Sequence, residues 1–343
     1  MISLDELQLA ARNHGMPLEA LRHEITPLGL HYLLTHYDIP AVDAGAWRLA
    51  VDGLVERPLT LSLDDLRARE AVTMPVTMEC AGNGRAQLEP HVVSQPWLTE
   101  AVGTMEWTGV PVTALLAEAG AGGDEVVFTG LDRGVEGGVE QDYARSLALA
   151  DCDGALLAYA CNGEPLPPQH GFPLRLVVPG WYGMTSVKWL TRLTVVDEPF
   201  EGYQMVTGYR MRRAEDDPGT PVTRIEPRSL MSPPGIPDFM TRRRFLPPGP
   251  VRLEGRAWSG WGPIERVEVG IDGVWSQARL GEPPGPAAWV PWWLDWDATE
   301  GEHELSCRAG DATGRSQPDA PTWNLGGYAN NAIHRIPVIV RTS

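Results

Sequence analysis

The side chains with the clearest chemistry in this sequence begin with one cysteine. Cys80 ends a β-rich segment, residues 72–79, and is followed by a loop that holds two glycines and Arg85. A nearby guanidinium and free backbone N–H groups lower the pKa of a thiol, so this position suits a nucleophile or a ligand for a soft metal. A small buried side chain that only fills space before a turn is the alternative interpretation.

A second group of candidate residues follows about ninety positions later. The run HGFPLRLVVPG contains His170 and Arg175, and the run VKWL contains Lys188, the only lysine of the chain. One strand and the turn after it would bring these three donors together. Such a set suits a phosphate or a fused polar heterocycle.

Short elements must position these side chains. Alternation and turn signals predict strands, with a hairpin around Asn162-Gly163, and a capping box at Ser62 predicts a helix. The predicted strands cover residues 47–55, 72–79, 125–130, 173–179 and 191–196, and the predicted helices cover 62–70 and 113–120. There is no βαβ rhythm and no GxGxxG, so a dinucleotide fold is disfavoured and a mixed α+β domain is predicted for residues 1–199.

The pattern changes in the last third of the chain. Short strands separated by turns are predicted at residues 251–258, 266–271, 275–280, 289–296, 303–309 and 334–341. This spacing predicts an immunoglobulin-like β-sandwich over residues 251–343. Residues 200–250 are rich in Pro and Arg, and we expect them to form an irregular linker packed near the active site.

Composition narrows the classes of function. With 343 residues and 43% hydrophobic side chains, the chain is long enough for two domains. Its formal net charge of −17 disfavours nucleic acid and anionic membranes as partners. No apolar run approaches the length of a bilayer span, and residues 1–13 carry neither a basic n-region nor an Arg pair, so a cytoplasmic location is expected.

The four cysteines argue against two further classes of site. They lie at Cys80, Cys152, Cys161 and Cys307 and form no CxxC pattern, so neither a zinc ribbon nor a disulfide scaffold is indicated. The chain also lacks a haem-attachment CxxCH and any flavin or iron–sulfur signature. A redox function would therefore need an external electron carrier.

Five ordered motifs resemble the molybdenum enzymes of the sulfite oxidase family. They are CAGN at 80–83, HGFPLRLVVPG at 170–180, VKWL at 187–190, a tyrosine after it, and WNL at 323–325 followed by NAIHR at 331–335. The resemblance covers nearly the whole chain. It implies a molybdopterin-dependent oxidoreductase with an α+β cofactor domain followed by an immunoglobulin-like dimerisation domain, and hence a homodimer.

The resemblance also implies roles for individual residues. Cys80 matches the single protein thiolate on molybdenum, whose other sulfur ligands come from the pterin dithiolene. The residues that match positions holding the pterin and its phosphate are His36, His170, Arg175 and Lys188. Tyr209 and Arg85 match active-site positions, and Trp97 matches a wall of the substrate pocket.

Two departures from the family pattern concern the substrate. Sulfite-oxidising members place arginines at the positions held here by Leu34 and Gly326, so binding of a sulfite dianion is expected to be weaker. The run Arg242 to Arg244 could replace them or form a solvated surface patch.

These observations predict an oxotransferase that moves an oxygen atom to or from a small oxyanion or oxide. Family precedent favours oxidation of sulfite to sulfate, and the missing arginines favour reduction of an S-oxide or N-oxide. A catalytically silent cofactor-binding protein is a further alternative. A cysteine hydrolase would need His170 as a base free of the pterin, and we disfavour it.

Overall fold

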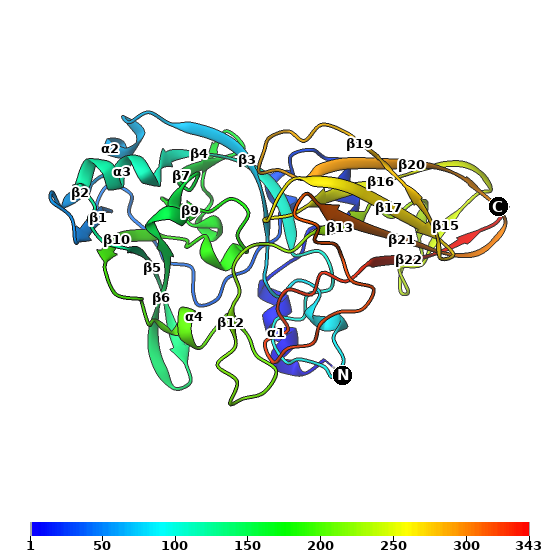
Figure 1. The fold of residues 1–343 in the computed structure, drawn as a ribbon, viewed down its shortest axis with the longest axis horizontal. Coiled ribbons are helices and arrows are strands. Elements are labelled where there is room, and N and C mark those ends of the chain that lie inside the picture. Colours follow the sequence, from blue (N-terminus) through cyan, green and yellow to red (C-terminus); the bar gives the residue numbers. More distant parts are fainter. Residues whose placement is uncertain (1, 343) are drawn as a thin grey trace.

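Two β-rich units lie side by side along the long axis of the molecule in a computed structural model that describes residues 2–342 (Figure 1). The first unit contains two sheets, and the second is a β-sandwich that ends near the C-terminus. This arrangement confirms the predicted fold class of an α+β domain followed by an immunoglobulin-like sandwich. No helix within residues 2–342 is long and apolar enough to span a bilayer.

The sheets of the first unit pack around one apolar core. One sheet has the order β2 (Leu59–Leu61), β1 (Leu49–Gly53), β10 (Leu190–Val196), β5 (Glu125–Glu136) and β6 (Val139–Ala148). The other contains β3 (Val72–Glu79), β4 (Val102–Pro111), β7 (Leu156–Cys161) and β8 (Glu164–Pro165), with β9 (Arg175–Val177) paired to β7. All these pairs are antiparallel except β1 with β10. Side chains from both sheets meet in the core, among them Leu49, Phe128, Val110, Leu157 and Leu176.

Helices are few and short, as the Gly and Pro content favours. The α-helices are α1 (Leu4–Arg12), α2 (Leu63–Arg67), α3 (Val112–Ala119) and α4 (Tyr203–Val206). The 3₁₀ turns are Leu18–Arg22, Leu28–Leu30, Arg85–Gln87, Leu149–Cys152, Pro168–His170 and Gly183–Thr185. The capping box of Ser62 and Asp65 is present, although α2 ends at Arg67 rather than at residue 70. Gly120 ends α3 in the left-handed conformation (φ +69°), which glycine adopts without strain.

The second unit consists of two packed sheets. One has the order β13 (Arg228–Met231), β16 (Gly249–Trp258), β20 (Val290–Ala298) and β19 (Arg279–Leu280). The other has the order β14 (Ile236–Pro237), β15 (Arg244–Leu246), β22 (His334–Val340), β21 (Gly301–Asp311), β17 (Ile264–Ile271) and β18 (Val274–Gln277). Alternate residues of these strands, such as Leu253, Val267, Leu305 and Val338, form its core.

Residues 200–250 differ from the irregular linker expected there. They contain α4, the small sheet of β11 (Arg210–Met211) and β12 (Thr220–Pro221), and three further strands. Strand β13 pairs with β16, and β15 pairs with β22, so part of this segment belongs to the sandwich. Its short strands escaped prediction because prolines interrupt any visible alternation.

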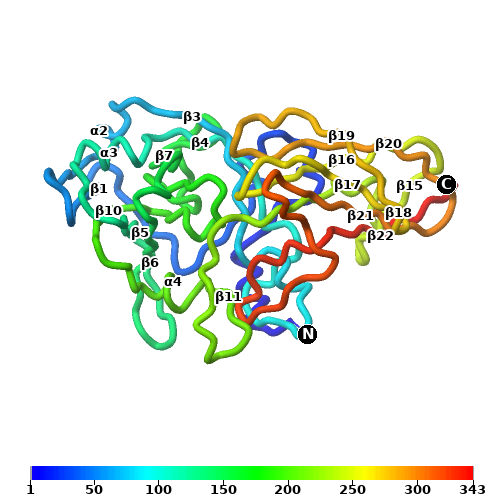
Figure 2. The backbone as a smooth tube through the Cα atoms, viewed as in Figure 1, coloured from blue at the N-terminus to red at the C-terminus, as the bar shows by residue number. Residues whose placement is uncertain are grey.

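The N-terminal segment, residues 2–36, passes between the two units (Figure 2). The indole N–H of Trp289 donates to the Glu24 carbonyl at 2.8 Å, and Arg256 donates to the Arg22 carbonyl at 3.2 Å. On its other side, the Thr26 N–H donates to the Thr104 carbonyl of β4 at 2.7 Å. The segment also contacts the first unit earlier in the chain, where the Met16 N–H donates to the Glu100 carbonyl at 2.8 Å, so it binds to both units.

A buried carboxylate joins the two units. Glu79 is the last residue of β3 and forms an ion pair with Arg228 of β13. Its other oxygen accepts a hydrogen bond from the indole of Trp258 at 2.7 Å, and Asn83 donates to the carboxylate at 3.0 Å. Because all four side chains are buried, each charge depends on the other for compensation.

We expect Glu79→Gln to destabilise the protein by about 3–5 kcal/mol, because it leaves the Arg228 guanidinium buried without its counter-charge. Denaturant unfolding measures the loss, and the double variant Glu79→Gln/Arg228→Met should recover part of it. Glu268→Gln removes the half-exposed partner of Arg308 (2.9 Å) and serves as the control, with an expected loss below about 1 kcal/mol. Equal losses for the two single variants would contradict the assigned role.

Candidate functional site

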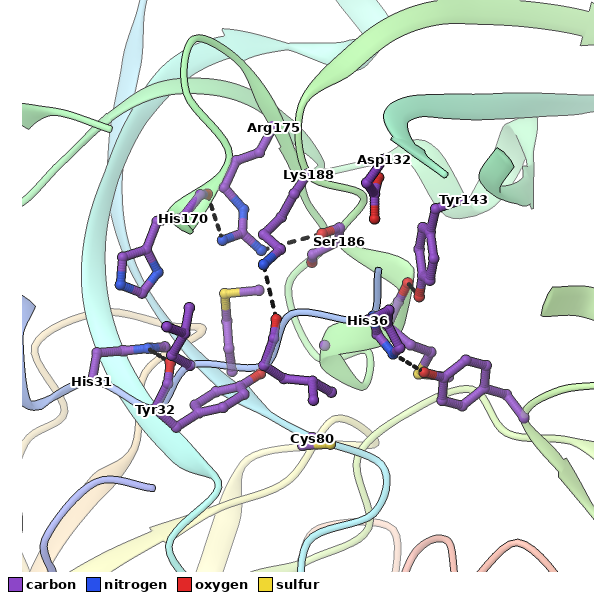
Figure 3. Close-up of a pocket in the computed structure, with 16 residues that line it drawn as sticks. His31, Tyr32, His36, Cys80, Asp132, Tyr143, His170, Arg175, Ser186 and Lys188 are labelled. Atoms are coloured by element: carbon purple, nitrogen blue, oxygen red, sulfur yellow. Dashed lines mark hydrogen bonds between the residues drawn. The ribbon is translucent and has the colours of Figure 1, made fainter. Parts of the chain in front are cut away.

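A cavity that is partly open to solvent lies beside the end of β3 (Figure 3). Three parts of the chain form its wall: the N-terminal segment, residues of β3, β5 and β6 together with Cys80, and the segment 170–209. The lining residues are His31, Tyr32, Leu33, Leu34, His36, Met78, Cys80, Asp132, Tyr143, His170, Arg175, Gly183, Met184, Ser186, Lys188 and Tyr209. The structure therefore brings together His36, Cys80, His170, Arg175, Lys188 and Tyr209, all of which the sequence singled out.

Cys80 presents the thiol of this cavity. Its N–H donates to the Ala101 carbonyl at 2.9 Å, and its own carbonyl accepts from Asn83 at 3.0 Å, so the residue is fixed where β3 turns into its loop. Burial raises the pKa of the thiol, and the charge of Arg85 opposes that rise. A metal ion would remove the remaining proton, because it binds the thiolate form.

Two cations, the buried Arg175 and the half-buried Lys188, form one wall. The Lys188 ammonium donates to the carbonyls of Leu34 (2.8 Å) and Gln169 (3.0 Å), and Arg175 donates to those of His170 (3.1 Å) and Ser186 (3.2 Å). Figure 3 shows Arg175 and Lys188 entering the cavity side by side, between His170 and Asp132. Burial, reinforced by the neighbouring Arg175 charge, lowers the pKa of Lys188 to about 7. An anion placed here would favour the charged form of Lys188, whereas Arg175, whose pKa burial lowers to about 10, is charged at neutral pH without it.

His36 and Tyr209 form a hydrogen-bonded pair on the opposite side. Burial lowers the pKa of His36 to about 3, and burial also raises the pKa of Tyr209 far above its ordinary value. The imidazole is therefore neutral, and its tautomer decides whether Nε2 donates to the phenol oxygen or accepts the phenol proton. Tyr143 stacks on His36 at 4.8 Å, and Tyr209 has a left-handed backbone (φ +52°), which tyrosine seldom adopts outside functional sites.

Arg85 and Trp97 lie beside Cys80 rather than in the cavity wall. Arg85 is buried and donates to the carbonyls of Gly326 (2.9 Å) and Gln95 (3.1 Å). Trp97 packs in the same apolar cluster as Cys80. Both residues thus border the thiol on the side where the C-terminal loop returns to the first unit.

The run Arg242 to Arg244 lines no part of this cavity. Arg244 is buried on β15, where it donates to the carbonyls of residues 233–235 and contacts Glu19 at 3.2 Å. Arg242 is exposed and lies 3.5 Å from the same carboxylate. These contacts hold the arginines in the sandwich, so they neither replace the missing pocket arginines nor form a wholly solvated patch.

Several residues of the site were not identified from the sequence. Those in the cavity wall are His31, Asp132, Tyr143 and Ser186, and the buried Arg145 lies next to the wall, with its guanidinium 5.5 Å from the ring centre of Tyr209. Asp132 follows a predicted strand, which is a usable signal for a polar residue at a strand end. Burial raises the pKa of Asp132 to about 7. His31 lies in a segment without periodicity, and its place depends on long-range pairing between His14 and Leu33.

The residues of the cavity fit a molybdenum-molybdopterin cofactor. Asp132 Oδ1 and His31 Nε2 are buried without a hydrogen-bond partner among the described residues, and a polar heterocycle would supply one. Lys188 and Arg175 offer cationic donors for a phosphate, and Cys80 offers one soft ligand for molybdenum.

Comparisons with known proteins agree with this geometry. Residues 36–204 match the family described as the oxidoreductase molybdopterin binding domain, and residues 232–341 match the Mo-co oxidoreductase dimerisation domain. Sulfite oxidase of Gallus gallus is 38% identical over 94% of this chain and 75% of its own length. Nitrate reductase of Hordeum vulgare is 32% identical over 92% of this chain, which spans 39% of that protein. The sulfane dehydrogenase SoxCD of Paracoccus pantotrophus has a similar structure, with a TM-score of 0.81, 31% identity, and coverage of 96% of this chain and 86% of that one.

We expect the apoprotein to gain stability from Lys188 as the pH rises from 7 to 9. The folded state holds this amine at a pKa of about 7, below its ordinary 10.5, so the unfolded chain binds more protons in this interval. The free energy of unfolding should rise by up to about 1.4 kcal/mol per pH unit relative to Lys188→Met. Urea unfolding at pH 7, 8 and 9 measures the difference, and parallel curves for the two proteins would refute it.

Proposed function

Because this chain belongs to the sulfite oxidase family of molybdopterin-dependent oxidoreductases, we propose that it oxidises a small sulfur oxyanion, with sulfite as the model substrate. One sulfite and one water give one sulfate, two protons and two electrons. The electrons pass to an external carrier. We infer the class of reaction from the relatives named above, and the substrate from the residues of the site.

One observation carries this proposal: the Cys80 thiol lines the same cavity as the cations Arg175 and Lys188 and the neutral pair of His36 and Tyr209. A thiol alone would allow many reactions. A thiol facing carbonyl-bonded cations across a cavity suits a phosphate-bearing metal cofactor.

When bound, the molybdenum cofactor supplies the two-electron acceptor for oxygen-atom transfer. Lys188 and Arg175 would hold its phosphate, His31 and Asp132 would bond its pterin, and Cys80 would ligate the metal. Burial of these groups excludes water from the reacting centre and strengthens each charge interaction there.

The remaining polar side chains act on the substrate. Tyr209 keeps its proton because its pKa is raised by burial, so the phenol serves as a hydrogen-bond donor at neutral pH. His36 orients that phenol when its neutral ring carries the proton on Nε2 and donates it to the phenol oxygen, which leaves the phenol proton free for the substrate. Arg85 carries a fixed positive charge beside Cys80, where an oxyanion substrate would approach.

Reduction of a neutral S-oxide or N-oxide is the second candidate. The observation that favours it is the apolar Leu34 in the cavity wall. The family resemblance implies an arginine at this position in sulfite-oxidising members. A pocket with fewer cations binds a dianion less tightly and discriminates less against neutral oxides.

Anaerobic titration of the molybdenum-loaded protein with sulfite tests the proposal. We expect the thiolate-to-metal absorption band to bleach at low sulfite concentration. Cys80→Ala should lack the band and lose at least about a hundredfold in kcat, whereas Cys161→Ala, which alters a buried cysteine outside the cavity, should retain both. A band that ignores sulfite but responds to an S-oxide after chemical reduction would favour the second candidate instead.

We further propose a homodimer formed through the sandwich. Ile236, Phe239 and Met240 are exposed on the β14–β15 hairpin, within the segment that matches the dimerisation family. A cluster of large apolar side chains at a surface is typical of a protein interface.

Light scattering should give twice the mass of one chain, and Phe239→Asp should shift the protein toward the monomer. The control, Val135→Asp, changes an exposed apolar residue of the first unit and should leave the mass unchanged. A monomer at micromolar concentration would contradict the proposal.

A further inference from the structure

We propose that Arg145 binds the substrate anion in this protein and replaces the arginine that position 326 lacks. The inference rests on the proposed function, because it names the residue that gives the same site its selectivity for an anion. Four observations carry it: where Arg145 lies, which partners it has, what it faces, and why residue 326 is glycine.

Arg145 lies on β6, two residues after Tyr143, so the two side chains share one face of the strand. Tyr143 and Tyr209 line the cavity, and the Arg145 guanidinium lies directly behind this wall, 5.5 Å from the ring centre of Tyr209. Arg145 is 3% exposed.

The hydrogen bonds of Arg145 do not compensate its positive charge. One terminal nitrogen donates to the backbone carbonyl of Gln204, while Nε has no partner among the described residues. The ion pairs found within residues 2–342 do not include Arg145. A buried guanidinium in this state is costly unless an anion joins it, and its planar fork of donors suits an oxyanion.

Two buried arginines flank two tyrosines at this end of the site. The Arg145 guanidinium lies 5.5 Å from the ring centre of Tyr209, and that of Arg85 lies 5.3 Å from the ring centre of Tyr328. The two rings are 5.2 Å apart. Both charges help to lower the pKa of His36, which places them within electrostatic reach of the same point.

Tyr328 explains why position 326 carries no arginine. A Cβ added to Gly326 would overlap the Tyr328 ring, so no side chain fits at 326 unless that ring moves. The backbone of Tyr328 is held because its N–H donates to Asn324 Oδ1 at 3.0 Å and its carbonyl accepts from Asn324 Nδ2 at 2.8 Å. In this protein the second guanidinium therefore reaches the site from β6 rather than from the C-terminal loop.

The test compares three variants of the molybdenum-loaded protein: Arg145→Met, Arg145→Gln and Arg145→Lys. Gln keeps a donor for the Gln204 carbonyl but no charge, and Lys keeps the charge. The control is Arg256→Met, which removes a buried arginine that donates to the Arg22 carbonyl near the sandwich. The readouts are KM and kcat for sulfite, and the rise in Tm with sulfate, which reports anion binding without turnover.

We expect Arg145→Gln and Arg145→Met to raise KM and to weaken sulfate binding at least about tenfold, with kcat changed less than about threefold. Arg145→Lys should recover part of the affinity, and Arg256→Met should leave KM and sulfate binding unchanged. A residue that only supports Gln204 would give the opposite pattern, because Gln would then rescue binding.

The outcomes separate this inference from the proposed function. If the protein oxidises sulfite and Arg145→Gln binds sulfate normally, the inference falls and the function stands. If the protein does not oxidise sulfite but its sulfate binding depends on Arg145, the anion site stands and sulfite is not the substrate. If sulfate neither binds nor stabilises the unaltered protein, both fail.

Discussion

The buried carboxylate of Glu79 is the contact on which the rest of the molecule depends. It sits one residue before Cys80 and takes Arg228 and Trp258 of the sandwich as its partners. The position of the thiol is therefore set by both units, and the sandwich is part of the active site's support. A buried ion pair tolerates little displacement of one unit relative to the other, because either charge alone would be uncompensated.

At the cavity, unlike at Glu79, the cationic side chains have no ion-pair partner within residues 2–342. Arg175 and Lys188 line the cavity, and Arg145 lies next to its wall; all three cations donate to carbonyl oxygens and have no carboxylate partner among the described residues. Carbonyls satisfy the donors but leave the charge uncompensated, so the folded chain presents positive potential to any anion that enters. The overall charge of −17 does not weaken this potential at short range, since exposed carboxylates are screened by solvent.

Contiguous motifs made part of this architecture predictable. Strand β3 has the predicted bounds, 72–79, and the motifs around residues 80, 170 and 188 each carry a cavity residue. Strands β4 and β6 were not predicted. The sequence of β6 contains charged residues and does not alternate between apolar and polar side chains, so it carries no visible strand pattern. Arg145 was missed for the same reason. Helix α1 begins with a capping box of Ser3 and Glu6, a signal that was present in the sequence but not used.

The cavity wall has a consequence for how the chain and its cofactor depend on each other. His36 meets Tyr209 across 173 residues of sequence, and Lys188 meets Leu34 across 154. No single local segment supplies half of the residues that line the cavity. We therefore expect the unfolded chain to bind the cofactor very weakly. Cofactor affinity and conformational stability are then two measures of one equilibrium: every tenfold excess of cofactor over its dissociation constant adds about 1.4 kcal/mol to the free energy of unfolding.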